Sequence, residues 1–163
     1  MKNTGDYDYQ YFRSSRKFQL DPLRTDRLVA EILLRNPQNV LDVGCGLGDV
    51  VRRLNKIGVE ATGVDNAEVL WKIFWKEHFF KEGDAKKLPF RDNSFDVVFS
   101  SDFFEHVPEE DIDTVLGEMK RVGRRILAVI AFEAELTERQ AKYHVTNKPR
   151  EWWIEKLPGV EIL

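Results

Sequence analysis

The fold of this 163-residue chain is decided by the stretch Val40-Leu41-Asp42-Val43-Gly44-Cys45-Gly46-Leu47-Gly48-Asp49. Its apolar start, together with Asn39, predicts a short buried strand, and its glycines predict a tight turn where a ligand can approach the backbone. Asp49 then begins a predicted helix, which Gly58 ends. The free N–H groups and the positive dipole end of that helix face the turn, so the stretch predicts a site for an anionic or electron-rich group. A tight turn without a ligand is the alternative.

Strands and helices alternate on both sides of this stretch. Hydrophobic periodicity predicts helices over residues 22–35, 49–57, 67–77, 108–122 and 150–157, and strands over residues 39–43, 59–65, 78–84, 95–100, 125–131 and 160–163. The nearly unbroken apolar run at residues 95–100 is typical of a strand that is covered on both faces. We therefore predict an α/β fold: a doubly wound, mostly parallel Rossmann-like sheet with helices on both faces.

Length and composition limit the remaining possibilities. The chain has the size of one domain, which we place at residues 1–163, with residues 1–21 as an amino-terminal arm or lid and residues 22–163 as the core. The 28 acidic and 25 basic side chains leave a net charge of −3, so no overall attraction to nucleic acid is expected. Cys45 is the only cysteine, which excludes an internal disulfide and fits a reducing compartment. Because the sequence has no signal-peptide pattern and no apolar run of membrane-spanning length, we expect a cytoplasmic protein without a membrane partner.

Candidate site residues follow from the strand ends, because ligands of such sheets bind outside the carboxyl ends of the strands. Asp65 ends the second strand about twenty residues after the glycines and suits a contact to ribose hydroxyls, with capping of the next helix as the alternative. Asp84, after the third strand, suits an adenine amino group or else a solvated turn. Glu105 and His106, after the fourth strand, suit a general base or a pair that positions the substrate. The alternatives for Glu105 are a contact to the glycine-loop backbone or helix capping, and those for His106 are helix capping or packing.

In combination and in order, these motifs resemble those of the class I S-adenosylmethionine (SAM)-dependent methyltransferases, in particular the subgroup that acts on small molecules. Residues 40–48 resemble the first motif of that family, and Gly63-Val64-Asp65 resembles the acidic end of its second strand. Gly83-Asp84-Ala85 and the run from Leu88 to Val98 are similar to its third- and fourth-strand region. Glu105-His106-Val107 is similar to the Glu-His pair that follows its fourth strand. The resemblance extends from Val40 to Val129.

The resemblance implies SAM as the cofactor, S-adenosylhomocysteine as the product, and a role for each matching residue. The implied cofactor-binding residues are Asp42, Gly44, Cys45, Gly46, Gly48, Asp65, Asn66, Asp84, Ala85, Ser100 and Ser101, and the candidate catalytic residues are Glu105 and His106. Asp42 and the glycine loop would hold the methionine part of SAM, and the two serines would lie under it. Asp65 and Asn66 would contact the ribose and the adenosine, while Asp84 and Ala85 would contact the adenine.

The carboxyl end departs from the family pattern. The family's sheet ends in a hairpin of strands six and seven, whereas this sequence stops at Leu163, so a truncated hairpin and an exposed sheet edge are expected, and a homodimer can pair that edge. The net charge and the absence of an Asn/Asp-Pro-Pro-Tyr-like run after the fourth strand disfavour nucleic acid, so a small-molecule acceptor is expected. Two segments are expected to wall the site. They are the amino-terminal arm with Tyr7, Tyr11, Phe12 and Arg13, and the segment from His144 to Trp153 with Trp152 and Trp153.

Two other functions compete with methyl transfer. A nicotinamide oxidoreductase requires Gly or Ala at position 49, where the carboxylate of Asp49 would instead repel a pyrophosphate. A non-catalytic or partner-dependent SAM-binding subunit is the second alternative. No metal centre is expected, because His78, His106 and His144 are scattered and no Cys-x-x-Cys occurs. A helix N-terminus lowers the pKa of a thiol, but no His or second Cys is paired with Cys45, which disfavours a reactive thiol.

Overall fold

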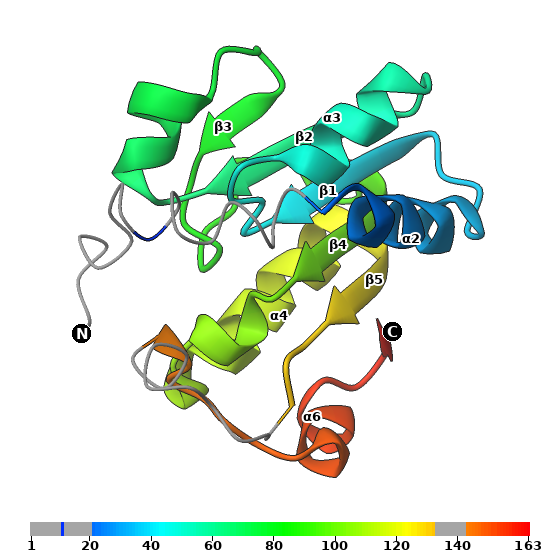
Figure 1. The fold of residues 1–163 in the computed structure, drawn as a ribbon. Coiled ribbons are helices and arrows are strands. Elements are labelled where there is room, and N and C mark those ends of the chain that lie inside the picture. The colour runs from blue at the N-terminus through cyan, green and yellow to red at the C-terminus, as the bar shows by residue number, and fades with distance from the viewer. Residues whose placement is uncertain (1–10, 12–20, 133–142) are drawn as a thin grey trace.

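The computed structural model describes residue 11, residues 21–132 and residues 143–163. Six strands form one sheet in the order β3-β2-β1-β4-β5-β6, and every neighbouring pair runs parallel (Figure 1). The strands are β1 (Asn39–Val43), β2 (Glu60–Asp65), β3 (Phe80–Glu82), β4 (Phe95–Ser101), β5 (Gly123–Val129) and β6 (Val160–Ile162). The predicted α/β fold with a parallel Rossmann-like sheet is confirmed.

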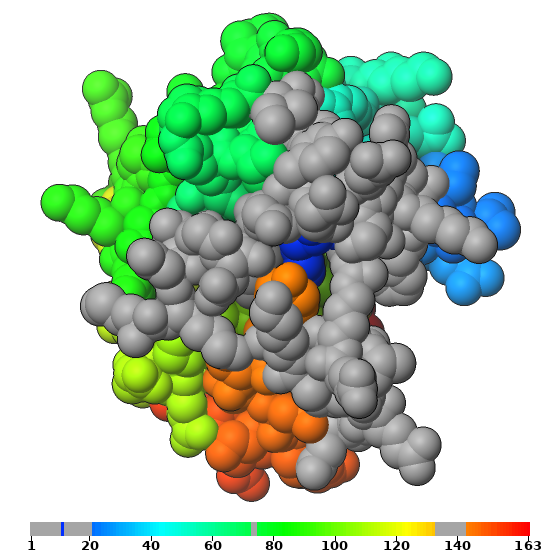
Figure 2. All heavy atoms as spheres, turned by 60° about the vertical axis from the view of Figure 1, so that its left-hand side comes forward, coloured from blue at the N-terminus to red at the C-terminus, as the bar shows by residue number. Residues whose placement is uncertain are grey.

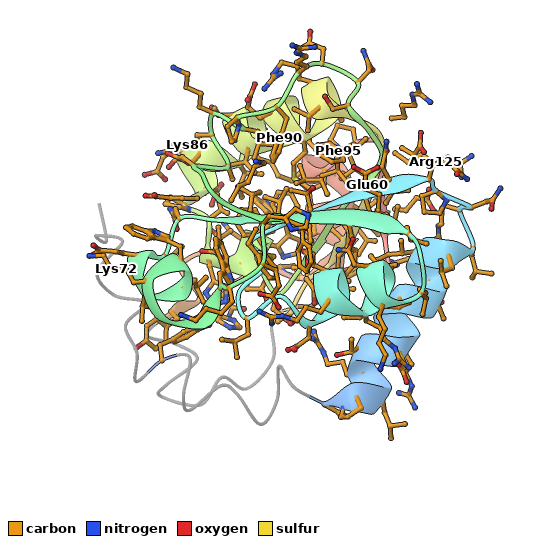
Figure 3. The ribbon with its side chains drawn as sticks, turned by 90° about the horizontal axis from the view of Figure 1, so that it is seen from above. Glu60, Lys72, Lys86, Phe90, Phe95 and Arg125 are labelled. Carbon is orange, nitrogen blue, oxygen red and sulfur yellow. The ribbon has the colours of Figure 1, made fainter. Side chains whose placement is uncertain are left out.

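Helices cover both faces of this sheet. The longer helices are α2 (Pro22–Leu33), α3 (Asp49–Lys56), α4 (Ile112–Val122) and α6 (Arg150–Lys156). α2 and α3 pack on one face with Val40, whereas α4 and α6 pack on the other face with Leu41. Neighbouring residues of a strand point to opposite faces, so β1 contributes to both layers of the core. Figure 3 shows the two helical layers from above, with the sheet between them.

All six strands end on the same side of the molecule. In Figure 3, Glu60 at the start of β2 and Arg125 near the start of β5 stand at one end of the sheet. Lys72 and Lys86, which follow β2 and β3, stand at the opposite end. The loops that carry the candidate site residues therefore meet at one edge of the sheet, as a parallel arrangement requires.

The predicted helix over residues 67–77 is wrong in its extent and type. The chain forms only a short π-helical turn, η2 (Leu70–Phe74), and Trp75 then adopts an extended backbone. The indole of Trp75 donates a hydrogen bond to the Gly46 carbonyl at 3.1 Å, and its ring stacks on Phe80 at 5.0 Å. These tertiary contacts end the helix three residues early.

Other element boundaries differ by smaller amounts. The predicted helix over residues 108–122 begins with a 3-10 turn, η4 (Glu109–Asp111), and a second 3-10 turn, η3 (Phe104–His106), follows β4. β5 begins at Gly123, which pairs with Phe95, and a Cβ atom there would lie 2.2 Å from Cγ2 of Val98, so this close pairing requires glycine. β3 is limited to three residues.

β6 is the outermost strand beside β5. It pairs in parallel through Val160, Glu161 and Ile162, and within the described ranges no antiparallel strand joins the sheet. In the same part of the chain, no helix has the length and apolar character needed to cross a bilayer.

Candidate active site

The glycine loop between β1 and α3 is held close to its neighbours. Gly44, Gly46 and Gly48 all have positive φ angles, which glycine adopts without strain. A Cβ atom on Gly44 would lie 2.3 Å from Cδ2 of Phe103, and one on Gly48 would lie 2.2 Å from Cζ of Phe80. The loop therefore requires glycine both for its backbone conformation and for the rings that lie against it.

Asp65 connects the end of β2 to this loop. Its two carboxylate oxygens accept hydrogen bonds from the backbone N–H groups of Gly46 and Ala67, each at 3.0 Å. Burial raises the pKa of Asp65, and the hydrogen bonds from Ala67 and Gly46 oppose that shift. The contact to Ala67 has the form of the capping alternative, but each oxygen retains a lone pair for a ligand hydroxyl.

Asp42 lies at the end of β1 and is almost completely buried. Among the described residues, no group donates a hydrogen bond to its carboxylate. Burial, reinforced by the negative charges of Asp65 and Asp49, raises the pKa of Asp42 well above its ordinary range. A buried carboxylate in such surroundings favours a ligand that brings a positive charge or hydrogen-bond donors.

The residues predicted to contact the adenosine lie farther out. Asn66 and Asp84 are exposed, and Ala85 packs partly against the core. The Oδ1 atom of Asp84 accepts a hydrogen bond from the N–H of Lys86 at 2.9 Å, which is the turn arrangement expected as its alternative.

The end of β4 brings together two serines and an ion pair. Ser100 is fully buried, and its Oγ has no hydrogen-bond partner in the described part of the chain. Arg24, from the first turn of α2, donates to Ser101 Oγ at 2.8 Å and forms an ion pair with Asp102. Asp102 has a positive φ of 50°, which Asp tolerates better than most residues. The sequence carries no signal that α2 would deliver Arg24 here, because the contact spans two distant elements.

Glu105 and His106, on η3, meet His144 to form a group that we call the Glu–His–His cluster. Each side chain offers one possible metal-ligand atom, and these three atoms all lie within 4.8 Å of one another. The ring centroids of His106 and His144 are also 4.8 Å apart. The expectation that the histidines are scattered is therefore wrong for this pair. His78 is separate and exposed.

Burial dominates the protonation of this cluster. It raises the pKa of Glu105 to about 8 and lowers that of His106 to about 4. Burial also lowers the pKa of His144. Nδ1 of His106 lies 3.0 Å from the Tyr143 carbonyl, which can only accept, so the neutral imidazole carries its proton on Nδ1.

The segment that begins at Tyr143 is fastened to the loop after β4. The Thr146 N–H donates to the Glu105 carbonyl at 3.1 Å, and Thr146 Oγ1 donates to the Val107 carbonyl at 2.7 Å. In Figure 2 this orange segment lies against the yellow-green residues that follow β4. Tyr11 packs edge-on against Tyr143 at 4.7 Å.

Three other predicted features have different outcomes. Burial, together with the charges of Asp42 and Asp65, raises the pKa of Cys45 well above its ordinary range, so the expected lowering by the helix N-terminus is wrong. Trp153 is buried in the core, whereas Trp152 is only half-buried. The remaining arm residues of interest, Tyr7, Phe12 and Arg13, lie outside the described residues.

Comparison with known proteins identifies the family to which this chain belongs. A family model described as "Methyltransferase domain" matches residues 41–126, which is more than half of the chain. The chain belongs to the class I SAM-dependent methyltransferases. The cofactor of this family is SAM, as the motifs indicated.

Several relatives support this assignment. The chain is 37% identical over 113 residues to a demethylmenaquinone methyltransferase of Thermotoga maritima, a match that covers 66% of this chain and 48% of the relative. It is 34% identical over 108 residues to a probable chloroplastic tocopherol O-methyltransferase of Oryza sativa subsp. japonica, covering 58% and 29%. A SAM-dependent methyltransferase structure from Archaeoglobus fulgidus superposes with a TM-score of 0.61 at 30% identity, covering 73% and 57%. The chain therefore spans about half or less of the length of these curated relatives.

Proposed function

We propose that this chain transfers the methyl group of SAM to a nucleophilic atom of a small-molecule acceptor. Family membership supports methyl transfer as the reaction. The carboxylates of Asp42 and Asp65, at the carboxyl ends of neighbouring strands, support SAM as the ligand. Relatives that match 107 to 113 residues are named as a demethylmenaquinone methyltransferase, a probable tocopherol O-methyltransferase and a sterol 24-C-methyltransferase, which supports a small organic acceptor.

The observation that carries this proposal is the buried carboxylate of Asp42, to which none of the described residues donates a hydrogen bond. A pyrophosphate would place further negative charge beside Asp42, Asp49 and Asp65, which opposes nicotinamide binding. The amino-acid end of SAM carries an ammonium group, and its ribose carries hydroxyls. These groups supply the positive charge and the donors that Asp42 and Asp65 favour, so the residues present fit the cofactor.

Each predicted residue then has a task. We propose that Asp42, Gly44, Cys45, Gly46 and Gly48 hold the methionine part, with Ser100 and Ser101 beneath it. Asp65 and Asn66 would contact the ribose and adenosine, and Asp84 and Ala85 the adenine. SAM supplies an activated methyl group on a sulfonium, so the protein mainly aligns the acceptor in line and excludes water. Such alignment lowers a barrier by roughly 7–11 kcal/mol.

Glu105 and His106 are the proposed groups at the acceptor. They lie on η3, which follows β4, and the end of β4 is where we expect the transferred group to face its acceptor. Where the acceptor loses a proton, this pair is placed to manage it. We also propose a cytoplasmic location, and pairing of an exposed sheet edge in a homodimer.

Ligand-induced stabilisation tests the proposal. The melting temperature of the chain is measured with SAM, S-adenosylhomocysteine and NAD in parallel. A ligand at a hundred times its dissociation constant adds about 2.7 kcal/mol, or roughly 5–10 °C for a chain of this size. We expect this shift with SAM and S-adenosylhomocysteine and no shift with NAD. A shift with NAD alone would contradict the proposal. Release of S-adenosylhomocysteine from SAM, measured over a panel of quinols, phenols and sterols, then identifies the acceptor.

A further inference from the structure

The Glu–His–His cluster combines three metal-ligating side chains from two segments of the fold. We propose that Glu105, His106 and His144 bind a divalent first-row transition-metal ion. Their ligand atoms lie within 4.8 Å of one another, so the three side chains can reach one ion. Glu105 and His106 come from η3, and His144 comes from the distant segment that Thr146 fastens to this loop. The site therefore exists only in the folded chain.

Two of the three side chains present buried atoms that no described residue satisfies. Glu105 is fully buried, and although its Oε1 accepts a hydrogen bond from the Ala131 N–H at 3.2 Å, its Oε2 has no partner within the described ranges. In the same residues, Nδ1 of His144 is also buried without a partner. Leaving buried polar atoms unpaired destabilises a fold, so two such atoms in one cluster indicate a missing ligand.

His106 is oriented in the way that metal-binding histidines usually are. Its Nδ1 lies 3.0 Å from the Tyr143 carbonyl. A histidine that binds a metal through one ring nitrogen usually donates from the other nitrogen to a carbonyl or carboxylate, which fixes the ring and its tautomer. The Tyr143 carbonyl supplies this contact, and it belongs to the residue next to His144.

The donor set selects the class of ion. Two imidazole nitrogens and one carboxylate oxygen suit Mn²⁺, Co²⁺ or Zn²⁺, whereas Mg²⁺ and Ca²⁺ prefer oxygen donors alone. Ligand atoms about 2.1 Å from an ion lie about 3.4 Å apart in a tetrahedron, so atoms that now lie up to 4.8 Å apart must approach one another by up to about 1.4 Å. Side-chain rotation can supply a movement of this size.

The role of this ion rests on the proposed methyl transfer. A divalent ion lowers the pKa of an oxygen bound to it, so an acceptor hydroxyl would release its proton to solvent without a protein base. That oxygen would then form the new C–O bond while the C–S bond of SAM breaks and its electron pair remains on sulfur. With the ion bound, Glu105 and His106 would hold the ion in place of taking the proton themselves, and the acceptor would carry a hydroxyl able to bind the ion.

Cobalt binding to the intact, tag-free chain tests the site without relying on activity. Chelator-treated protein is titrated with Co²⁺, and the visible d–d absorption and binding heat are recorded. We expect one Co²⁺ per chain with an absorption typical of nitrogen and oxygen ligands. Glu105→Gln, His106→Ala and His144→Ala should each weaken binding at least about tenfold. His78→Ala is the matched control, because this histidine is exposed and separate, and it should bind as the unchanged chain does.

Each variant is first checked by circular dichroism and thermal melting, and Glu105→Gln retains an oxygen that can accept from Ala131. Absence of Co²⁺ binding to the folded chain overturns the proposal, as does unchanged binding in folded His144→Ala or Glu105→Gln.

The SAM-induced thermal shift is measured on the same samples. A SAM shift without Co²⁺ binding leaves the methyltransferase proposal intact and removes the metal site. Co²⁺ binding without a SAM shift supports the metal site and contradicts the methyltransferase proposal. Loss of methyl transfer after chelation, restored by Co²⁺ or Mn²⁺, supports the proposed role of the ion.

Discussion

Asp42 and Asp65 end neighbouring strands, yet their carboxylates have different surroundings. Asp65 accepts two backbone hydrogen bonds and thereby holds the glycine loop to the start of the next helical turn. Asp42 is more deeply buried and receives no donor from the described residues. We expect such a buried carboxylate to destabilise the ligand-free chain, which is typical of a binding site where the ligand supplies the missing hydrogen-bond donors.

We expect Asp42→Asn to stabilise the ligand-free chain and to weaken SAM binding. Because the pKa of Asp42 is raised in the folded chain, its favourable contribution is complete below the ordinary carboxyl pKa, near 3.9, and is lost as the pH rises through the folded-state value. At neutral pH the Asn variant should therefore gain about 1–3 kcal/mol, and its stability should vary less with pH. Urea unfolding across the range from acid to neutral pH measures the first effect, and calorimetry with SAM measures the second.

Asp84→Asn is the control for this change, because Asp84 is an exposed aspartate of the same edge. It should leave the free energy of unfolding at neutral pH unchanged. An Asp42→Asn chain that is less stable than the parent at neutral pH, or that binds SAM with equal affinity, would contradict the interpretation of Asp42 as an unpaired buried charge.

At the scale of elements, the glycine loop is fixed by aromatic side chains from other parts of the chain. Phe103 lies against Gly44, Phe80 lies against Gly48, and the Trp75 indole binds the Gly46 carbonyl. The contact with Trp75 also explains why the helix after β2 is short. Helical periodicity describes one segment at a time, so it could not anticipate that this tryptophan would leave the helix to reach the loop.

Three glycine-to-alanine variants separate backbone strain from close packing. Gly44 has a φ of 72° and no room for a Cβ atom, whereas Gly58 has a φ of 88° and open space. Gly58→Ala should lower the free energy of unfolding by about 1–2 kcal/mol through backbone strain alone. Gly44→Ala should lower it by about 1–3 kcal/mol more, because the added methyl group also meets the Phe103 ring. Gly117, inside α4, has open space and no positive φ, so Gly117→Ala should gain about 0.5–1 kcal/mol. Chemical denaturation measures all three. Equal losses of stability in Gly44→Ala and Gly58→Ala would show that the Phe103 ring moves aside without a measurable loss of stability.

For the molecule as a whole, the sheet order does not by itself identify the ligand. The order β3-β2-β1-β4-β5-β6 is also that of dinucleotide-binding Rossmann domains. The distinction depends on the acidic strand ends and on the family match over residues 41–126. The sheet also separates the core into two layers, one under α2 and α3 and the other under α4 and α6.

This layered core predicts that changes on opposite faces act independently. Ile32 on α2 and Met119 on α4 are both fully buried, in different layers. Ile32→Ala and Met119→Ala should each cost about 2–5 kcal/mol, since each leaves a cavity. In the double variant the losses should add within about 0.5 kcal/mol, which a double-mutant cycle of urea unfolding measures. A larger coupling energy would mean that the sheet transmits repacking from one layer to the other.

The sequence alone determined the order of strands and helices, the parallel sheet and the SAM-family motifs, because hydrophobic periodicity and turn glycines are local properties. It also placed Asp65, Glu105 and His106 at the ends of strands, since all parallel strands end at one edge. Only the tertiary structure decided which side chains meet there. It joins Arg24 to Asp102 and His144 to His106, and it buries the Asp42 carboxylate where no described residue donates to it. These outcomes depend on contacts between segments that are distant in sequence, and burial then sets the protonation of the groups that those contacts enclose.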